Sequence, residues 1–158
     1  MEIPMNEQTT EKQTLQPRVF QIKMSKKCFR FKEEALTNHA PHAPGIYEFV
    51  VFDEQGTGTI LYVGLALPPL TVHEALRRHL DNEVAPTAET LFKKTPNVYF
   101  DYVASGDIES AEDLKDIAAA FIAKNSPVFN EGPAQYTGRY SSVSVQEIEQ
   151  LPGGACRP

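Results

Sequence analysis

Two tyrosines lie fifteen residues apart in the first half of this chain, each in a glycine-containing triplet. Gly45-Ile46-Tyr47 and Tyr62-Val63-Gly64 both fall inside runs of β-favouring residues. Arg77-Arg78-His79 follows in a helical pattern, and Pro127-Val128-Phe129-Asn130 closes the block. Phosphodiester hydrolysis is the reaction that we consider for these residues. It needs a deprotonated nucleophile, a cation against the charge of the transition state and help for the leaving oxygen.

The two triplets and the closing Pro-x-x-Asn resemble the GIY-YIG nuclease family over residues 44–130. In that family two tyrosines and an arginine flank the scissile phosphate, and a single glutamate holds the divalent metal. The first tyrosine is assigned to activating water. The resemblance therefore implies these catalytic candidates: Tyr47, Tyr62, Arg77 or Arg78, and His79. Asn130 matches the asparagine that ends the family's block.

The family's metal-binding glutamate has no counterpart in this chain. It is expected about nine residues before Pro127, where the sequence has Ala118. Residues three, four or seven positions away share its helical face, and none is a carboxylate: Ala111, Leu114, Lys115, Phe121, Ile122 and Asn125. Asp116 lies about 200° around the helix and points away. We therefore expect no metal ligand and no cofactor at this place.

Two residues offer a substitute for the missing carboxylate. Lys115 lies one turn before Ala118 and could place a positive charge where the metal would be, which would bind a phosphate but would not activate water. Glu131, directly after the closing asparagine, or another acid of the C-terminal segment could instead be a relocated ligand for Mg²⁺ or Mn²⁺.

The elements that position these residues follow from hydrophobic period and turn chemistry. The pattern predicts, in order, a helix over 32–38, strands over 45–52 and 59–64, helices over 71–82 and 86–94, a strand over 98–104, and a helix from Asp107 or Ser110 to Asn125. Short extended pieces over 19–22 and 28–31 precede them. A capping box at Ser144–Glu147 predicts a further short helix to Leu151. The order predicts an α+β fold, a small three-stranded antiparallel sheet flanked by helices.

The composition is that of one globular domain, with 158 residues, 41% hydrophobic and 23% charged. We expect a disordered tail over 1–16, an N-terminal extension packing on the domain over 17–43, the GIY-YIG-like domain over 44–130 and a C-terminal extension over 131–158. No apolar run is long enough to span a membrane. Two cysteines near opposite ends predict no disulfide framework, so a cytoplasmic location is expected.

A net charge of -6 argues against a broad, non-specific grip on nucleic acid. The charges are nevertheless separated along the chain. Most basic residues fall in two stretches: Lys23, Lys26, Lys27, Arg30 and Lys32, then Arg77, Arg78, Lys93 and Lys94. Residues 101–116 hold six acids against Lys115 alone. Lys93, Lys94, Lys115 and Asn130 are the nucleic-acid-binding candidates.

Three functions follow as hypotheses. The leading one is a GIY-YIG-type domain whose metal-dependent nuclease chemistry is lost or reduced, retained as a nucleic-acid-related binding or regulatory module. The second is an active metal-dependent DNA endonuclease with a relocated metal ligand. The third is a protein-binding module in which the acidic stretch over 101–116 docks a basic partner. The sequence does not indicate the oligomeric state.

Overall fold

The computed structural model describes residues 14–148, so the expectations for residues 1–13 and 149–158 lie outside the described residues. Within this range the chain forms four helices and six strands. In chain order they are β1 (Pro17–Met24), β2 (Phe29–Arg30), α2 (Glu33–His39), β3 (Gly45–Phe52), β4 (Gly58–Ala66), α3 (Val72–Leu80), α4 (Ala88–Lys94), β5 (Tyr99–Gly106), α5 (Ala111–Asn125) and β6 (Ser142–Glu147).

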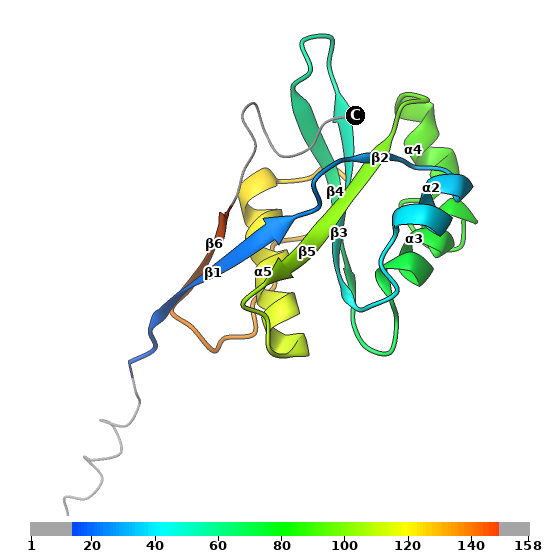
Figure 1. The fold of residues 1–158 in the computed structure, drawn as a ribbon. Helices are drawn as coiled ribbons and strands as arrows, with labels where there is room; N and C mark the ends of the chain where they lie inside the picture. The colour runs from blue at the N-terminus through cyan, green and yellow to red at the C-terminus, as the bar shows by residue number, and fades with distance from the viewer. Residues whose placement is uncertain (1–13, 149–158) are drawn as a thin grey trace, which may run out of the picture.

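The α+β class is confirmed, but the expected three-stranded sheet is wrong, because the described residues form six strands. The strand order is β4-β3-β5-β1-β6, with β2 pairing on β5. The additional strands come from segments expected to be extensions. β1 pairs antiparallel with β5, and β6 runs parallel to β1 with Ile22 opposite Glu147. Figure 1 shows β1 and β6 side by side at one end of the sheet.

The short helix predicted from the capping box at Ser144 is wrong over its described part, where the chain is strand β6. Burial alternates along this strand, with Val143 and Val145 turned inward and the serines exposed. A capping box is a local signal. The alternation of valine and serine, together with the free edge of β1, favours a strand at this place.

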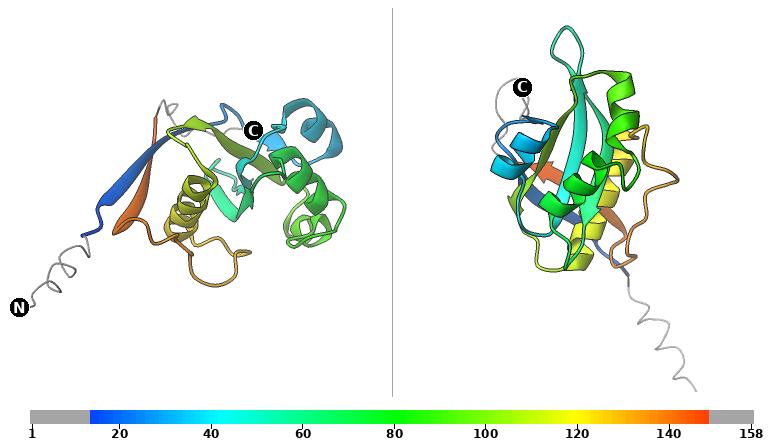
Figure 2. Two further views of the ribbon diagram at one scale, coloured as in Figure 1. Left: turned by 90° about the horizontal axis from the view of Figure 1, so that it is seen from below. Right: turned by 90° about the vertical axis from the view of Figure 1, so that its right-hand side faces the viewer.

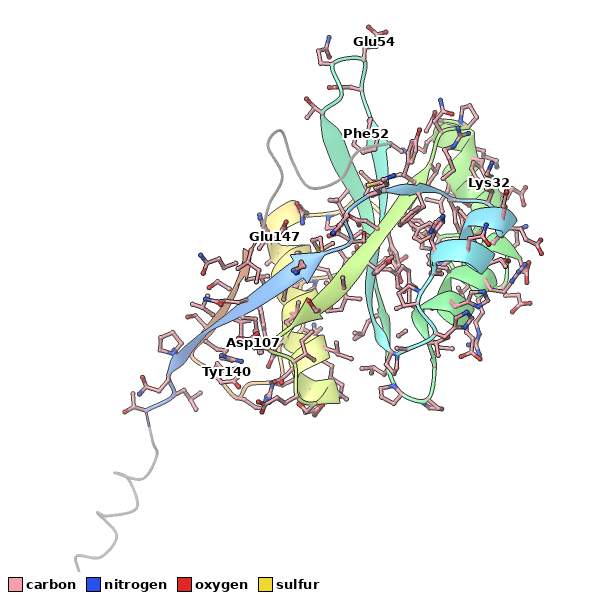
Figure 3. All side chains as sticks on the ribbon, in the orientation of Figure 1. Lys32, Phe52, Glu54, Asp107, Tyr140 and Glu147 are labelled. Atoms are coloured by element: carbon pink, nitrogen blue, oxygen red, sulfur yellow. The ribbon has the colours of Figure 1, made fainter. Side chains whose placement is uncertain are left out.

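The central hairpin and the main helices form as predicted. In the hairpin loop Asp53 Oδ1 accepts hydrogen bonds from the backbone N–H groups of Gln55 and Thr57. The tip of this hairpin, near Glu54, projects from the body of the molecule in Figure 3. Helix α3 begins with the complete capping box, in which Thr71 and Glu74 bond each other's backbone N–H groups. These local signals need no tertiary support, because each side chain satisfies a nearby backbone donor.

Two hydrophobic clusters occupy opposite faces of the β3–β4 hairpin. Tyr47 and Phe49 point toward α2, α3 and α4. The alternate residues Ile46 and Val63 point toward α5, where they contact a cluster that includes Ala118. In the left view of Figure 2 the hairpin lies between α5 and the other helices. Functional residues on β3 and β4 are therefore assigned to one helix layer or the other by their register.

Two further expectations concern location. Cys28 is buried and disulfide-bonded, although the sequence predicted no disulfide framework. Disulfides persist mainly in oxidising compartments, so this bond does not favour the cytoplasmic expectation. Across residues 14–148 the structure has no helix that is long and apolar enough to cross a membrane.

Candidate functional site

A buried tyrosine–histidine pair lies at the centre of the α3-facing side of the sheet. Tyr47 extends from β3, and its hydroxyl lies 2.7 Å from Nε2 of His79 on α3. The two residues are 3% and 2% exposed, so bulk water does not compete for this bond. Sequence reasoning proposed both residues as catalytic candidates, and the structure brings them into direct contact.

The second ring nitrogen of His79 fixes the direction of that hydrogen bond. Nδ1 lies 2.9 Å from the carbonyl oxygen of Pro86, which can only accept, so Nδ1 carries the proton. Nε2 of the neutral ring must then accept the proton of the Tyr47 hydroxyl. Burial lowers the pKa of His79 despite its backbone hydrogen bonds. Burial, and then the nearby Tyr62, raise the pKa of Tyr47 above its ordinary value.

The glycine of the second triplet makes room for the Tyr47 ring. Gly64 lies opposite Tyr47 in the β3–β4 register. A Cβ atom at Gly64 would be 2.1 Å from Cζ of Tyr47, far inside any real contact distance. The two triplets are thus linked physically, because the tyrosine of the first lies across the glycine of the second.

Tyr62 is the more accessible of the two tyrosines. It lies opposite Phe49 in the hairpin, its ring centroid is 6.4 Å from that of Tyr47, and it is partly exposed. Phe129 packs against the same cluster and is bonded to the edge of β4 through Leu61. Nζ of Lys94 lies 5.7 Å from the Phe129 ring centroid, a cation–π distance. Aromatic and cationic groups therefore adjoin one another at this edge.

The two arginines of α3 have different surroundings. The Arg77 guanidinium forms ion pairs with Glu33 at 3.4 Å and with Asp81 at 3.9 Å. Arg78 is exposed and forms no ion pair with any residue in the described range. Neither arginine has a hydrogen bond to Tyr47 or Tyr62 within that range. Arg78 is therefore the arginine that is available to an external anion.

Ala118 lines a cavity on the opposite side of the sheet from the Tyr47–His79 pair. The cavity has a volume of about 340 Å³, and β4 contributes Val63 and Leu65 to its apolar wall. Both substitutes named from the sequence also line it, Lys115 from α5 and Glu131 from the following loop. Lys115 is paired with Glu112 at 3.1 Å. The structure thus brings Lys115 and Glu131 to Ala118, but not to the tyrosines.

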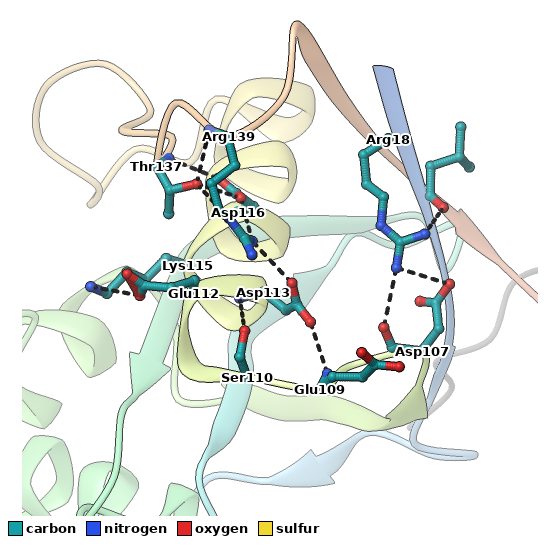
Figure 4. Close-up of polar contacts among 11 residues, drawn as sticks. Arg18, Asp107, Glu109, Ser110, Glu112, Asp113, Lys115, Asp116, Thr137 and Arg139 are labelled. Atoms are coloured by element: carbon teal, nitrogen blue, oxygen red, sulfur yellow. Dashed lines mark hydrogen bonds and ion pairs between the residues drawn. The ribbon is translucent and has the colours of Figure 1, made fainter. Parts of the chain in front are cut away.

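The acids of α5 that point away from Ala118 hold the C-terminal segment. Arg139 Nη2 lies 2.9 Å from Oδ1 of Asp113 and 2.8 Å from Oδ2 of Asp116, and Thr137 bonds Asp116 through its backbone N–H and its hydroxyl. Figure 4 shows this network beside Lys115 and Glu112. Burial acts to raise the pKa of each aspartate, but the hydrogen bonds outweigh it and the net pKa is lowered. Sequence reasoning missed the role of Arg139.

Asn130 has a backbone-binding role in the structure. Its Oδ1 accepts from the N–H of Val63 at 2.8 Å, and its Nδ2 donates to the carbonyl of Val63 at 2.9 Å. The side-chain amide thereby pairs with the outer edge of β4 as a neighbouring strand would. Both polar atoms of this nucleic-acid-binding candidate are already used. The Pro-x-x-Asn motif found the residue, but its spacing did not reveal this contact.

Two buried acids were also missed as a pair. Glu48 and Asp101 lie directly opposite one another on β3 and β5, and each is 4% exposed. The sequence signal was an acid at the centre of each of two apolar strands, whereas Asp101 was assigned to the acidic stretch. Among residues 14–148, no group of three or more His, Cys, Asp or Glu is arranged to hold a metal ion.

Comparison of the chain with protein-family models, with curated proteins and with solved structures gave no match.

Proposed function

We propose that this protein is a nucleic-acid-binding module of the GIY-YIG type in which metal-dependent phosphodiester hydrolysis is lost or reduced. The observation that carries the proposal is the buried 2.7 Å contact between the Tyr47 hydroxyl and Nε2 of His79. A phenol that donates its proton to a neutral imidazole has no free base to offer a water molecule.

The energetics of proton transfer support a neutral tyrosine. Moving the proton from Tyr47 to His79 costs about 5 kcal/mol at the ordinary pKa values of the two groups. The structure enlarges this cost from both sides, because it raises the pKa of Tyr47 and lowers that of His79. The phenolate that water activation requires is therefore a rare state of this pair.

The position of Ala118 also supports loss of hydrolysis. Ala118 on α5 packs against the sheet face that carries Ile46 and Val63. Tyr47 points from the opposite face of the sheet toward α3. The nearest helical acids, Asp113 and Asp116, are engaged by Arg139. A metal bound by these aspartates would have to displace Arg139.

Binding is supported by the cations and rings beside Tyr62. Lys93 and Lys94 are exposed at the end of α4 and form no ion pair with another described residue. Lys94 adjoins the Phe129 ring, and Tyr62 is partly exposed in the same cluster. Proteins that bind single-stranded nucleic acid commonly use this combination, because bases stack on aromatic rings while cations neutralise phosphates.

The binding proposal is tested by fluorescence anisotropy with labelled single-stranded and duplex oligonucleotides. Lys93→Gln/Lys94→Gln is compared with Lys26→Gln/Lys27→Gln, which removes the same charge from two exposed lysines of the other basic stretch. We expect only the first variant to weaken binding, and to lower the slope of log K against log salt by about 1.4 for single strands. Equal effects of the two variants would show that binding is general charge attraction, and would refute a binding surface at Lys93 and Lys94.

Loss of hydrolysis is tested separately, by incubating plasmid, branched and single-stranded DNA with Mg²⁺ or Mn²⁺. We expect no cleavage above that of a mock preparation. Robust cleavage that Tyr47→Phe abolishes in a folded variant would show that the tyrosine is catalytic.

An active nuclease with a relocated ligand is the second candidate, and one observation favours it. Glu131 lines the same cavity as Ala118 and is exposed to solvent. Calorimetric titration with Mn²⁺ tests this candidate directly. Stoichiometric binding that is absent in Glu131→Gln would support it over the binding module.

The third candidate is a protein-binding module that uses the acids of residues 101–116, and most of these acids are buried or ion-paired in the structure. Asp101 is buried, and the other acids of residues 101–116 except Glu109 have cationic partners. These partners are Arg18 for Asp107, Lys115 for Glu112, and Arg139 for Asp113 and Asp116. A protein partner of this stretch would meet ion pairs, not an open acidic surface. Pull-down from lysate with and without nuclease treatment separates the two classes of partner.

A further inference from the structure

The cavity of about 340 Å³ beside Ala118 lies between α5 and β4, on the sheet face opposite the Tyr47–His79 pair. The methyl side chains of Ala118 and Ala119 leave space there that larger residues would fill. The apolar wall comes from α5, from β4 and from the turn after β4: Ala118, Ala119, Ile122, Val63, Leu65 and Leu67. The space therefore depends on small residues at two adjacent positions of α5.

The large apolar side chains of this wall are only partly covered by protein. Leu65, Leu67 and Ile122 are half-buried, although all three pack against the hydrophobic cluster that contains Val63 and Ala118. Covering apolar surface that is in contact with water lowers the free energy of the system. The wall therefore suits a ligand whose body is apolar.

One rim of the cavity is the loop over residues 131–136, which is held at both of its ends. Before the loop, the Asn130 side chain bonds the backbone of Val63 on β4. After the loop, Thr137 bonds Asp116 on α5 at 2.8 Å and 2.7 Å, and Figure 4 shows this end. The loop between these contacts lines the cavity. A rim fixed in this way needs little ordering when a ligand binds, which lowers the cost of binding.

Two charged residues line the cavity, and they differ in what they already bind. Nζ of Lys115 lies 3.1 Å from Oε1 of Glu112. Glu131 is exposed, and its carboxylate forms no ion pair or hydrogen bond with another residue of the described range. An anionic ligand would have to compete with Glu112 for Lys115, whereas a cationic ligand would meet the Glu131 carboxylate without displacing a protein group. The charge at the cavity therefore favours a cation.

We propose that this cavity binds a small primary ammonium ion with a compact apolar body. The body packs between Ala118 and the leucines of the opposite wall, and the ammonium group pairs with Glu131. A volume of about 340 Å³ is near the lower end of the range for small-molecule sites, so the body is a single ring or a short branched chain. This site does not depend on nucleic-acid binding, because Lys93, Lys94 and the Tyr62 ring do not line the cavity.

The probe is 2-phenylethylammonium, which has one ring, a short chain and a positive charge at neutral pH. Its binding to the full chain is followed by the backbone amide chemical shifts in nuclear magnetic resonance. The comparison probes are 2-phenylethanol, which is neutral, and 3-phenylpropionate, which carries a carboxylate on a similar body. We expect saturable shifts around residues 118–122 and 131–135, with the ammonium bound at least about fivefold more tightly than the carboxylate.

Glu131→Gln tests the charge at the cavity, and it changes an exposed residue that the fold does not need. We expect it to weaken binding of 2-phenylethylammonium by about two- to fivefold, the range of a partly exposed ion pair, and to leave 2-phenylethanol unaffected. Glu109→Gln makes the same chemical change at an exposed acid on the β5–α5 loop and should alter neither affinity.

Ala118→Leu tests the space, because the larger side chain occupies the cavity. We expect it to weaken binding of the ammonium and the alcohol alike, by about tenfold or more, whereas Ala123→Leu makes the same change at an exposed position of α5 and should not. No saturable binding, equal affinities for ammonium and carboxylate, or unchanged ammonium binding in Glu131→Gln or in a folded Ala118→Leu protein would overturn the proposal. If Ala118→Leu does not fold, the result for Glu131→Gln still decides it.

Discussion

Replacing Tyr47 by phenylalanine tests the tyrosine–histidine pair most directly. The change removes one oxygen atom and leaves Nε2 of His79 buried without a donor, since Nδ1 remains on Pro86. A buried acceptor that loses its partner costs about 1–3 kcal/mol. Tyr62→Phe removes the same atom from a partly exposed ring whose hydroxyl has no hydrogen bond to a described residue, so it should cost less than about 0.5 kcal/mol.

Urea denaturation followed by circular dichroism measures both variants against the parent protein. With a typical slope of about 2 kcal/mol per molar urea, Tyr47→Phe should lower the midpoint by about 0.5–1.5 M, while Tyr62→Phe leaves it nearly unchanged. His79→Leu and the double variant Tyr47→Phe/His79→Leu complete a cycle with an expected coupling of about 1–2 kcal/mol. Equal costs for the two tyrosines, or additive effects in the cycle, would show that the hydroxyl is not bonded to His79. The cycle also calibrates any nuclease assay, because activity lost in Tyr47→Phe counts only after correction for unfolded protein.

Three further changes test the contacts around this pair and on α5. Gly64→Ala should destabilise the fold by about 1–3 kcal/mol, because the new methyl group collides with the Tyr47 ring. Thermal unfolding compares it with Gly56→Asn, because a Cβ atom at Gly56 has no neighbour within 4 Å and asparagine tolerates positive φ. Asn130→Ala should lower the free energy of unfolding measured with urea by about 1–3 kcal/mol, since both backbone groups of Val63 lose their partner at the β4 edge. Val128→Ala, at an exposed residue nearby, should lower it much less. Arg139→Met should lower stability near neutral pH and flatten its decline below about pH 4, because the lowered pKa values of Asp113 and Asp116 stabilise the fold only above the ordinary carboxyl range. An Arg139→Met protein with the parent's full acid sensitivity would contradict this last assignment.

Local signals on the chain predicted most of the elements. The capping box of Thr71 and Glu74, the Ser110 cap of α5 and the loop at Asp53 each appear as expected, because each depends on groups within a few residues. The valine–serine alternation over 142–147 carried the true signal for β6. A capping box at the same place outweighed it in the sequence interpretation, since nothing local indicates that β1 offers a free edge more than a hundred residues earlier.

The candidate site was predicted as a set of residues but not as an arrangement. The family resemblance named Tyr47, Tyr62 and His79 together, and their rings lie in one cluster. Counting along α5 identified Ala118, but the count carries no information on which sheet face that helix covers. Only the register of β3 and β4, with Tyr47 on one side and Val63 on the other, assigns Ala118 to the opposite layer.

Two clusters of acidic residues, one on α5 and one buried in the sheet, contribute to stability with opposite dependences on pH. The aspartates bonded by Arg139 have lowered pKa values, so their contribution is present above the ordinary carboxyl range and is lost as pH falls through the lowered values. Glu48 and Asp101 have raised pKa values, so their contribution is complete below the ordinary carboxyl range and is lost as pH rises through the raised ones. Because burial raises the pKa of Asp101 to about 6, the two clusters together favour the folded state most between the ordinary carboxyl range and about pH 6.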